Sequence, residues 1–366
     1  MVDLRGQLHG NDYASGPEEV VVASIPVGAA RPDRRGSARR IVYRPEFGVF
    51  LALAMCESAF GALSSHFFTV PEWGNIMAVA ALDGIPAVAV TFLMISGEFD
   101  LSIGTVFALS PMLFTYLVIN SHWQPELALV VGMLAAGAVG LCNAAVTVWA
   151  GVPSFITTLG MFMILTGVEV TFNGGNPLAL NTTSPGVSTI ATVLAGALGG
   201  NDSFFSMLVP WFVVSVIAGA WVLRSTRFGN WVLAAGGNAE SARSVGVPVR
   251  RVKTLNFVAC SLTAGIAGIM QVAYIQQWAP TQGETLQLTA ILIAVVGGAS
   301  LFGGSGSAIG TGLGAILVAS LASGLVVVGA PGSWYTSFIG LILIASVVIN
   351  IKTGKLVGGR RRRLFR

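Results

Sequence analysis

Lysine and arginine are absent from two long stretches of this 366-residue chain, from Pro45 to Leu223 and from Thr254 to Ile351. All twenty basic residues fall in the N-terminal tail, in one internal segment or in the C-terminal tail. Charged residues make up 10% of the chain, against about 25% in soluble domains, and 54% of the residues are apolar. A soluble domain of this size needs far more polar surface, so the composition predicts a polytopic membrane protein.

Residue types that carry redox, metal and nucleotide chemistry are also scarce. The three cysteines lie in apolar tracts without a Cys-x-x-Cys pair, which indicates buried side chains rather than disulfides or metal ligands. The three histidines show no metal-binding spacing, so no metal site is expected. No Gly-x-x-x-x-Gly-Lys-Ser/Thr loop occurs, so we expect no nucleotide or other cofactor bound by this chain itself.

The positions of the basic residues predict the topology, because Lys and Arg collect at the cytoplasmic ends of membrane spans. Apolar tracts near the roughly 20 residues that a ~30 Å hydrocarbon core requires predict an all-α protein of about ten spans. They cover about residues 47–65, 75–95, 101–119, 126–149, 153–172, 206–223, 255–277, 286–301, 307–329 and 332–350. Six spans precede the basic segment and four follow it, so both termini are predicted to be cytoplasmic. The span 286–301 is short and is predicted to be a broken or re-entrant element.

Three regions follow from this pattern. Residues 1–44 are expected to be a disordered basic cytoplasmic tail, 45–351 the transmembrane domain with a cytoplasmic loop at 224–254, and 352–366 a second basic cytoplasmic tail. Residues 1–40 lack the apolar core of a cleavable signal peptide. These flanks explain the net charge of +4 better than a nucleic-acid partner does.

Two smaller features concern the opposite side of the membrane. The loop from Asn173 to Asn201 contains no basic residue and is predicted to be external, with a short helix over 187–198 at the outer surface. Several tryptophans fall near predicted span ends, Trp278 among them, and this placement predicts an interfacial belt.

The basic segment 224–254 contains signals for a short helix. Asn238 is a favourable N-cap, and Glu240 suits the positive helix start. Gly246 can adopt the left-handed conformation that ends a helix, and Pro248 prevents its continuation. These signals predict a helix of about two turns over 239–245, which is too short to be stable alone. It either rests on the membrane or docks a cytoplasmic partner.

Acidic residues occur in the first base-free stretch, where a carboxylate at mid-membrane costs about 2.5–3.5 kcal/mol. Asp100 stands at the expected start of a span and is predicted to cap free backbone N–H groups, with Ser102 close by. A direct role in a solute pathway is the alternative, and the two roles are compatible.

Polar groups in the neighbouring spans have the same two interpretations. Pro153 suits the first turn of a helix, and the hydroxyls of Thr157 and Thr158 can bond backbone carbonyls or neighbouring helices. A pore-lining role is the alternative for these residues and for Asn143. Further on, Gly306, Gly310 and Gly314 recur every fourth residue, which predicts a smooth helix face for close packing rather than a nucleotide site.

Four stretches of the chain, in order, resemble motifs of one family, the ribose-type sugar permeases of bacterial ABC importers. They are Ser-Gly-Glu-Phe-Asp-Leu-Ser-Ile-Gly at 96–104, Val-Pro-Ser-Phe-Ile-Thr-Thr-Leu-Gly at 152–160, the small-Gly-Gly-Asn stretch at 234–238 with its following helix, and Gly-Gly-Ala-Ser-Leu-Phe-Gly-Gly-Ser-Gly at 297–306. The similarity covers roughly residues 47–351. The chain departs from the family at Glu98 and Phe99, where Gly and Ile are common.

The resemblance implies a permease subunit in a bacterial inner membrane that moves a sugar or sugar-like solute and is not itself an enzyme. Its implied partners are a second permease subunit in a homo- or heterodimer, two cytoplasmic ATPase domains that hold ATP and Mg²⁺, and an external solute-binding protein. The implied ATPase-coupling residues are Gly236, Gly237, Asn238, Ala239, Glu240, Ser241, Arg243 and Gly246. Arg243, Arg250 and Arg251 are candidates to pair with acidic groups of the ATPase.

The candidate translocation-pathway residues are Glu98, Phe99, Asp100, Ser102, Asn143, Pro153, Thr157 and Thr158. A rival interpretation from another class is a cation-coupled secondary transporter or channel. It would use Glu98, Asp100 or Glu169 as an ion site.

Overall fold

The computed structural model describes residues 45–180, 184–198, 204–331, 334–346 and 348. Both predicted tails lie outside these residues. The regular structure of the described chain is helical, apart from a two-residue antiparallel ladder between β1 (Leu178–Ala179) and β2 (Gln277–Trp278) and one isolated bridge. The helices are α2 (Pro45–Leu63), η1 (Ser65–Phe68), α3 (Val70–Ile95), α4 (Ile103–Ile119), α5 (Pro125–Ala144) continued by the π-helical turn η2 (Ala145–Trp149), α6 (Ser154–Asn173), α7 (Pro185–Ala195), α8 (Leu208–Ser225), α9 (Arg227–Gly237), α10 (Ala239–Ser244), α11 (Val249–Ile275), α12 (Leu286–Val296), α13 (Ala308–Val327) and the helix Trp334–Ser346.

Every predicted span coincides with a helix, and the prediction of an all-α polytopic membrane protein is confirmed. Within the described residues seven helices are long and apolar enough to cross a membrane. The other three predicted spans are the shorter apolar helices α4, α12 and Trp334–Ser346. The count of ten crossings therefore stays a prediction.

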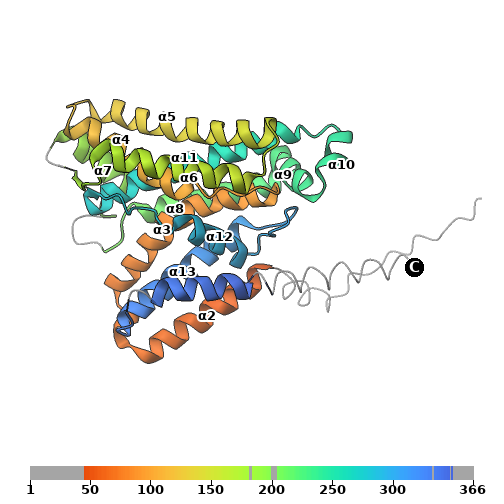
Figure 1. Ribbon diagram of the computed structural model, residues 1–366. Coiled ribbons are helices and arrows are strands. Elements are labelled where there is room, and N and C mark those ends of the chain that lie inside the picture. The colour runs from red at the N-terminus through yellow and green to blue at the C-terminus, as the bar shows by residue number, and fades with distance from the viewer. Residues whose placement is uncertain (1–44, 181–183, 199–203, 332–333, 347, 349–366) are drawn as a thin grey trace, which may run out of the picture. The chain divides into compact units, whose positions relative to one another are not determined.

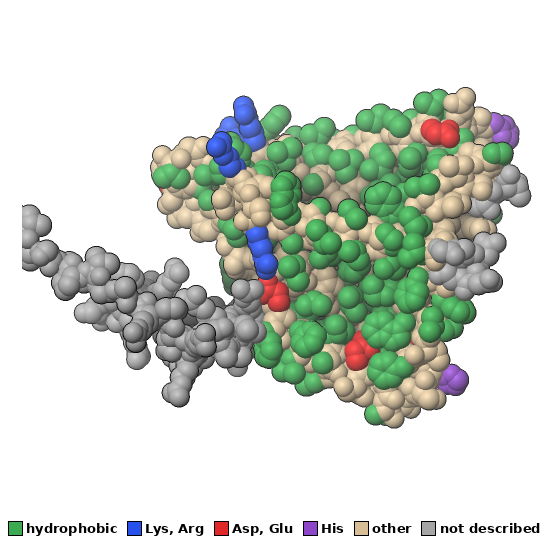
Figure 2. Space-filling view, turned by 180° about the vertical axis from the view of Figure 1, so that it is seen from behind, with side chains coloured by type: hydrophobic (Ala, Val, Ile, Leu, Met, Phe, Trp, Pro, Cys, Tyr) green, Lys and Arg blue, Asp and Glu red, His purple; other side chains and the backbone are tan. Residues whose placement is uncertain are grey.

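One end of the bundle, which we name the basic end, carries every described Lys and Arg. These are Arg224, Arg227, Arg243, Arg250, Arg251 and Lys253, on α8, α9, α10 and the first turns of α11. Figure 1 shows α9 and α10 at this end and α7 at the opposite end. Figure 2 shows basic side chains toward one end of a largely apolar face.

Contacts at the basic end fix the direction of three helices. The Arg224 guanidinium pairs with the Glu46 carboxylate at 2.7 Å, and the Ser307 hydroxyl donates to the same oxygen at 2.8 Å. Glu46 lies in the first turn of α2, Arg224 in the last turn of α8, and Ser307 is the N-cap of α13. The chain thus leaves this end at α2 and has returned to it by the end of α8, as an even number of crossings requires.

The helix α3 is the central element, because 83% of the residues in its most apolar stretch are buried. It packs against α13, α11, α8 and α12, while α11 also packs on α4 and α5. Glycines allow these helices to approach closely. A Cβ atom added at Gly268 of α11 would overlap the Phe107 carbonyl oxygen of α4, so the two backbones are in direct contact there.

The helix α12 has 11 residues and begins inside the bundle. The preceding loop folds back between helices: Trp278 Nε1 donates to the Ala108 carbonyl at 2.9 Å, and Gln282 Nε2 donates to the Gly268 carbonyl at 3.1 Å. Gly283 has φ +78°, and its backbone lies against that of Gly104 at the start of α4. This arrangement agrees with the broken element predicted over 286–301. Trp278 is fully buried, so its assignment to an interfacial belt was wrong.

The predicted packing of the second glycine series is confirmed for two of its three residues. Gly310 and Gly314 on α13 meet the carbonyl oxygens of Gly297 and Ile293 on α12. Gly306 precedes the helix and contacts the Ile95 side chain instead.

The segment 224–254 is more helical than the sequence predicts. The helix α9, which was not predicted, begins where Thr226 Oγ1 accepts the Gly229 N–H at 3.1 Å, and it buries Gly229, Val232 and Ala235. The three glycines of α9 lower its helix propensity, and for this reason the sequence did not predict a helix there. The helix α11 begins at Val249 rather than at 255, because Pro248 takes its N-cap position. Arg250, Arg251 and Lys253 therefore stand on its first turns.

Candidate functional site

A buried polar cluster occupies the break between α3 and α4. Asp100 is inaccessible to solvent, and its Oδ1 accepts the Ser102 N–H at 2.8 Å and the Ser102 hydroxyl at 2.6 Å. Asp100 therefore bonds the N–H of Ser102, which is itself the N-cap residue of α4, rather than the N–H groups of the first helical turn as predicted. Asn143 on α5 donates from Nδ2 to Ser102 Oγ at 2.8 Å and to Asp100 Oδ2 at 3.4 Å. We name Asp100, Ser102 and Asn143 the Asp100 cluster. It ties the start of α4 to α5 across 41 residues of sequence.

The stretch 152–160 lies beside this cluster. Pro153 is the N-cap residue of α6 rather than part of its first turn. Ser154 Oγ accepts the Phe99 N–H at 3.2 Å, and the Thr158 hydroxyl donates to the Ser154 carbonyl at 2.8 Å. Thr157 is buried, and its hydroxyl has no hydrogen-bond partner among the described residues. Ser154, which sequence reasoning missed, therefore joins two of the four family-like stretches.

Glu98 points to a different neighbour. Its carboxylate pairs with Lys253 Nζ at 2.5 Å, and both side chains are mostly buried, with 14% and 17% exposure. One turn further along α11, Asn256 Nδ2 donates to the Phe92 carbonyl at 3.2 Å. The first turns of α11 are thus bonded to the end of α3. Lys253 was missed in the sequence, although a carboxylate in a stretch without bases needs a partner from one of the basic segments.

The two glycines of the coupling stretch have opposite surroundings. Gly236, at the end of α9, packs so closely that an added Cβ would overlap the Ile95 carbonyl oxygen, which also accepts the Gly304 N–H at 2.8 Å. Gly237 has open space where a side chain would stand. Gly236 is therefore a packing residue that joins α9 to the end of α3 and to the 303–304 turn.

The helix α10 has the predicted caps. Asn238 Oδ1 accepts the Ser241 N–H at 2.9 Å, and Gly246 has φ +87°. Ala242 is buried against an apolar cluster that includes Val232 and Val249. The residues on the other face of α10 are exposed: Glu240, Ser241, Arg243 and Ser244. Val245, just beyond the helix, is 78% exposed. The helix is thus held from one side and presents the other side outward.

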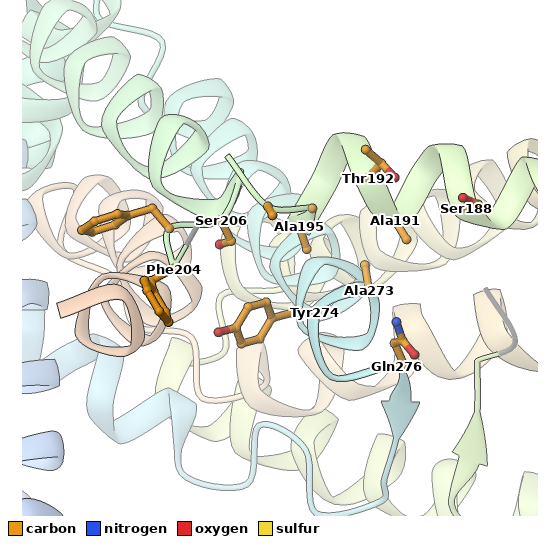
Figure 3. A pocket seen from close by; sticks show the side chains of 12 residues that line it. Ser188, Ala191, Thr192, Ala195, Phe204, Ser206, Ala273, Tyr274 and Gln276 are labelled. Carbon is orange, nitrogen blue, oxygen red and sulfur yellow. The ribbon is translucent and has the colours of Figure 1, made fainter. Parts of the chain in front are cut away.

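A hollow of about 500 Å³ lies near the opposite end, between α7, residues 204–206 and the end of α11. Figure 3 shows the Tyr274 ring reaching into it, with Phe204 and Ser206 on one side and Thr192 of α7 on another. No acidic or basic side chain is among its described lining residues, and none of the predicted pathway residues reaches it.

The carboxylates that a cation site would need do not converge. Glu98 pairs with Lys253, Asp100 belongs to its own cluster, and Glu169 is buried on α6. Among the described residues no three acidic, His or Cys side chains lie close enough together to hold a metal ion.

Removing the acceptor of the Asp100 cluster is expected to destabilise the bundle. Asp100→Ala leaves the Ser102 and Asn143 donors buried without their carboxylate, which should lower the unfolding free energy by about 3 kcal/mol. Ser102→Ala removes a hydroxyl but keeps the carboxylate, so about 1 kcal/mol is expected. Thermal unfolding in detergent measures both variants. An Asp100→Ala midpoint equal to that of the native protein would show that the cluster contributes nothing to stability.

Residues 73–347 match the protein family described as branched-chain amino acid transport system / permease component. The chain belongs to this family, so it is a transport component rather than an enzyme. It is 31% identical over 306 residues to the ribose import permease protein RbsC of Escherichia coli strain K12. The aligned residues cover 82% of this chain and 92% of the relative. It is 30% identical to the xylose/arabinose import permease protein XylH of Sulfolobus acidocaldarius (85% and 86% covered) and 28% identical to the fructose import permease protein FrcC of Rhizobium meliloti (82% and 83%). No solved structure matches.

These comparisons confirm the resemblance inferred from the four stretches. They favour an importer permease over the cation-coupled transporter, since the relatives are named as import permeases.

Proposed function

We propose that this chain is the membrane permease of a binding-protein-dependent ABC importer that carries a sugar or sugar-like solute across the bacterial cytoplasmic membrane. The names of the relatives support the solute class. The observation that carries the coupling assignment is the geometry of α10, which is packed on one face and exposed on the other at the basic end.

ATP and Mg²⁺ are bound by two partner ATPase domains, and α10 docks into them. The docking surface is formed by three exposed residues of the predicted coupling set, Glu240, Ser241 and Arg243, together with Val245, which was not in that set. Arg243, Arg250 and Arg251 line a shallow groove beside α10 and offer positive charge to acidic groups of the ATPase. A second permease subunit and an external solute-binding protein complete the assembly.

Movement of α10 passes to the break between α3 and α4 through contacts that the structure contains. The Gly236 backbone at the end of α9 lies against the Ile95 carbonyl, the last residue of α3. Lys253 on α11 holds Glu98 three residues later, and Asp100 follows. Closure of the ATPase pair thereby shifts the start of α4 relative to α5 and α6, and the bundle switches between outward- and inward-open states.

The proposed topology places the basic end in the cytoplasm, because Lys and Arg are retained there during insertion. With ten crossings both termini are cytoplasmic, and α7 and the hollow beside Tyr274 face outward.

A charge change on the exposed face of α10 is expected to prevent ATPase binding. The double variant Arg243→Glu/Val245→Asp reverses the charge and removes the exposed apolar side chain without touching buried Ala242. We expect copurification of the ATPase to fall at least tenfold while the permease stays in the membrane. Arg227→Glu, the same reversal of one arginine at the start of α9 on the same end, is the control and should retain the ATPase. Undiminished copurification of the double variant would refute the docking assignment.

Reconstitution separates the proposed importer from the cation-coupled rival. Proteoliposomes with permease, ATPase and binding protein are expected to accumulate sugar only when ATP is supplied. Uptake by the permease alone under a proton or sodium gradient would instead establish the rival.

A further inference from the structure

A cavity of about 250 Å³ lies within the bundle and contains none of the residues that the sequence proposed for the pathway. Its lining residues come from α3, α4, α11, α12, α13 and the helix Trp334–Ser346. Its polar lining side chains are Asp83, Gln271, Thr285, Thr289 and Tyr335. The cavity is slightly smaller than the roughly 300–1,000 Å³ typical of ligand pockets, so only a small solute would fit.

The cavity lies halfway along the central helix α3. Asp83 stands thirteen residues after the first residue of α3 and twelve before the last. At 1.5 Å per residue, it is about 18–20 Å from either end of this central helix. Thr285 and Leu286 stand where the short helix α12 begins inside the bundle. Solute sites of transporters are typically found at this depth, beside interrupted helices.

Two polar side chains of the cavity, Asp83 and Gln271, are not used up by the packing of the bundle, whereas the Thr289 hydroxyl already donates to the Thr285 carbonyl at 3.1 Å. No basic side chain among the described residues forms an ion pair with the Asp83 carboxylate. The Oε1 atom of Gln271 is buried and has no hydrogen-bond partner among the described residues. Tyr335 lies close to both Asp83 and Thr289. A carboxylate inside a membrane span without a basic partner costs free energy, and such residues usually have a function in binding or transport.

The chemistry of the lining defines the ligand class. A carboxylate accepts hydrogen bonds, an amide both donates and accepts, and the Thr and Tyr hydroxyls do the same. No described Lys, Arg or His lines the cavity, so it offers no positive charge to an anionic solute. Phe107 and Val79 supply an apolar wall. A small neutral molecule with several hydroxyl groups satisfies such a lining.

We infer that the Asp83 cavity is the transient binding site of the permease for a neutral polyhydroxylated solute during translocation. This inference rests on the proposed importer function. The solute is held between the central helix α3 and the broken helix α12, with Asp83, Gln271 and Thr289 bonding its hydroxyls.

Variants at Asp83 test the site in the complete transporter with its ATPase and binding protein. The probes are radiolabelled ribose, xylose and fructose, each supplied separately. We expect Asp83→Ala to lower ATP-driven uptake at least tenfold, with ATPase activity still stimulated by the binding protein. Asp83→Asn keeps hydrogen bonding and should retain at least a third of native uptake. Glu126→Gln, at an exposed acid at the start of α5, is the control and should transport normally.

Cysteine labelling tests the cavity without depending on the solute. In a chain whose three native cysteines are replaced by Ala, Ala322→Cys on the cavity wall should react with a charged, water-soluble methanethiosulfonate. The rate should change at least tenfold between the nucleotide-free and the ATP–vanadate states. Leu134→Cys on α5, 67% exposed on an apolar helix, is the lipid-facing control and should stay unlabelled.

The outcomes separate the two levels of the proposal. If the native complex takes up none of the sugars, the proposed solute class fails, and a state-dependent Ala322→Cys rate still supports a water-filled pathway through the cavity. If native uptake is active but Asp83→Ala transports normally, or Ala322→Cys never reacts, the cavity is not the site and the importer function stands. If Asp83→Asn is as inactive as Asp83→Ala, the negative charge itself is required, which overturns the neutral ligand class.

Discussion

Gly236→Ala is expected to lower the unfolding free energy by about 3 kcal/mol and to reduce ATP-driven transport at least tenfold. The added methyl group would overlap the Ile95 carbonyl oxygen and approach the Gly304 backbone N–H, and neither is a flexible side chain that can move aside. Overpacking of this kind typically costs about 1–3 kcal/mol, and the clash with backbone places this site at the upper end. Thermal unfolding in detergent and uptake by the reconstituted complex measure the two effects.

Gly237→Ala is the matched control, one residue away in the same stretch. No atom lies within contact distance of its added methyl group, and Ala favours helix by roughly 0.5–1 kcal/mol over Gly. The control should therefore unfold at or slightly above the native temperature. Equal behaviour of the two variants would mean that the close approach of α9 to Ile95 does not hold the coupling segment in place.

Breaking the pair between Glu98 and Lys253 is expected to have the second large effect. Either Glu98→Gln or Lys253→Met leaves one mostly buried charge without its partner, which should lower the unfolding free energy by about 2–3 kcal/mol, somewhat less than for a fully buried pair. The double variant removes both charges and should recover most of that loss. A double-mutant cycle from denaturation midpoints gives the coupling energy directly.

The exposed pair at the basic end supplies the comparison. Arg224 is 51% exposed at its side chain, so Arg224→Gln should cost less than about 1 kcal/mol even though its distance to Glu46 is short. Transport assays distinguish stability from coupling: the Glu98 and Lys253 variants should also lose solute-stimulated ATP hydrolysis, whereas Arg224→Gln should keep it. A coupling energy near zero for the buried pair would remove it from the proposed route between α10 and Asp100.

Local signals in the sequence predicted local structure well. The cap at Asn238 and the turn in which Asp100 bonds the Ser102 N–H were found because each side chain bonds a backbone group two or three residues away. The helix α9 was missed because Gly229, Gly236 and Gly237 lower the helix propensity of a segment whose buried face stabilises it. Burial against neighbouring helices overrode intrinsic propensity there.

The candidate site was predicted only in part. The stretches 96–104 and 152–160 do meet, but they meet through Ser154 and the Phe99 backbone rather than through Thr157 or Pro153. The coupling glycines were grouped together, yet Gly236 faces the bundle and Gly237 does not. Such differences depend on which neighbouring helix crosses at each residue. Residue type and spacing along the chain do not reveal these crossings.

The sequence by itself determined that this is a helical membrane protein of the import permease family, with its basic residues grouped in three segments. Those properties follow from composition and from short motifs, because the bilayer requires apolar helices and a cap acts within one turn. The tertiary structure alone decided that Lys253 pairs with Glu98 across 155 residues and that Asp83 lines a polar cavity halfway along α3. Both result from the crossing of helices that are distant in sequence, because only the folded chain brings together the partner of a buried charge or the lining of a cavity.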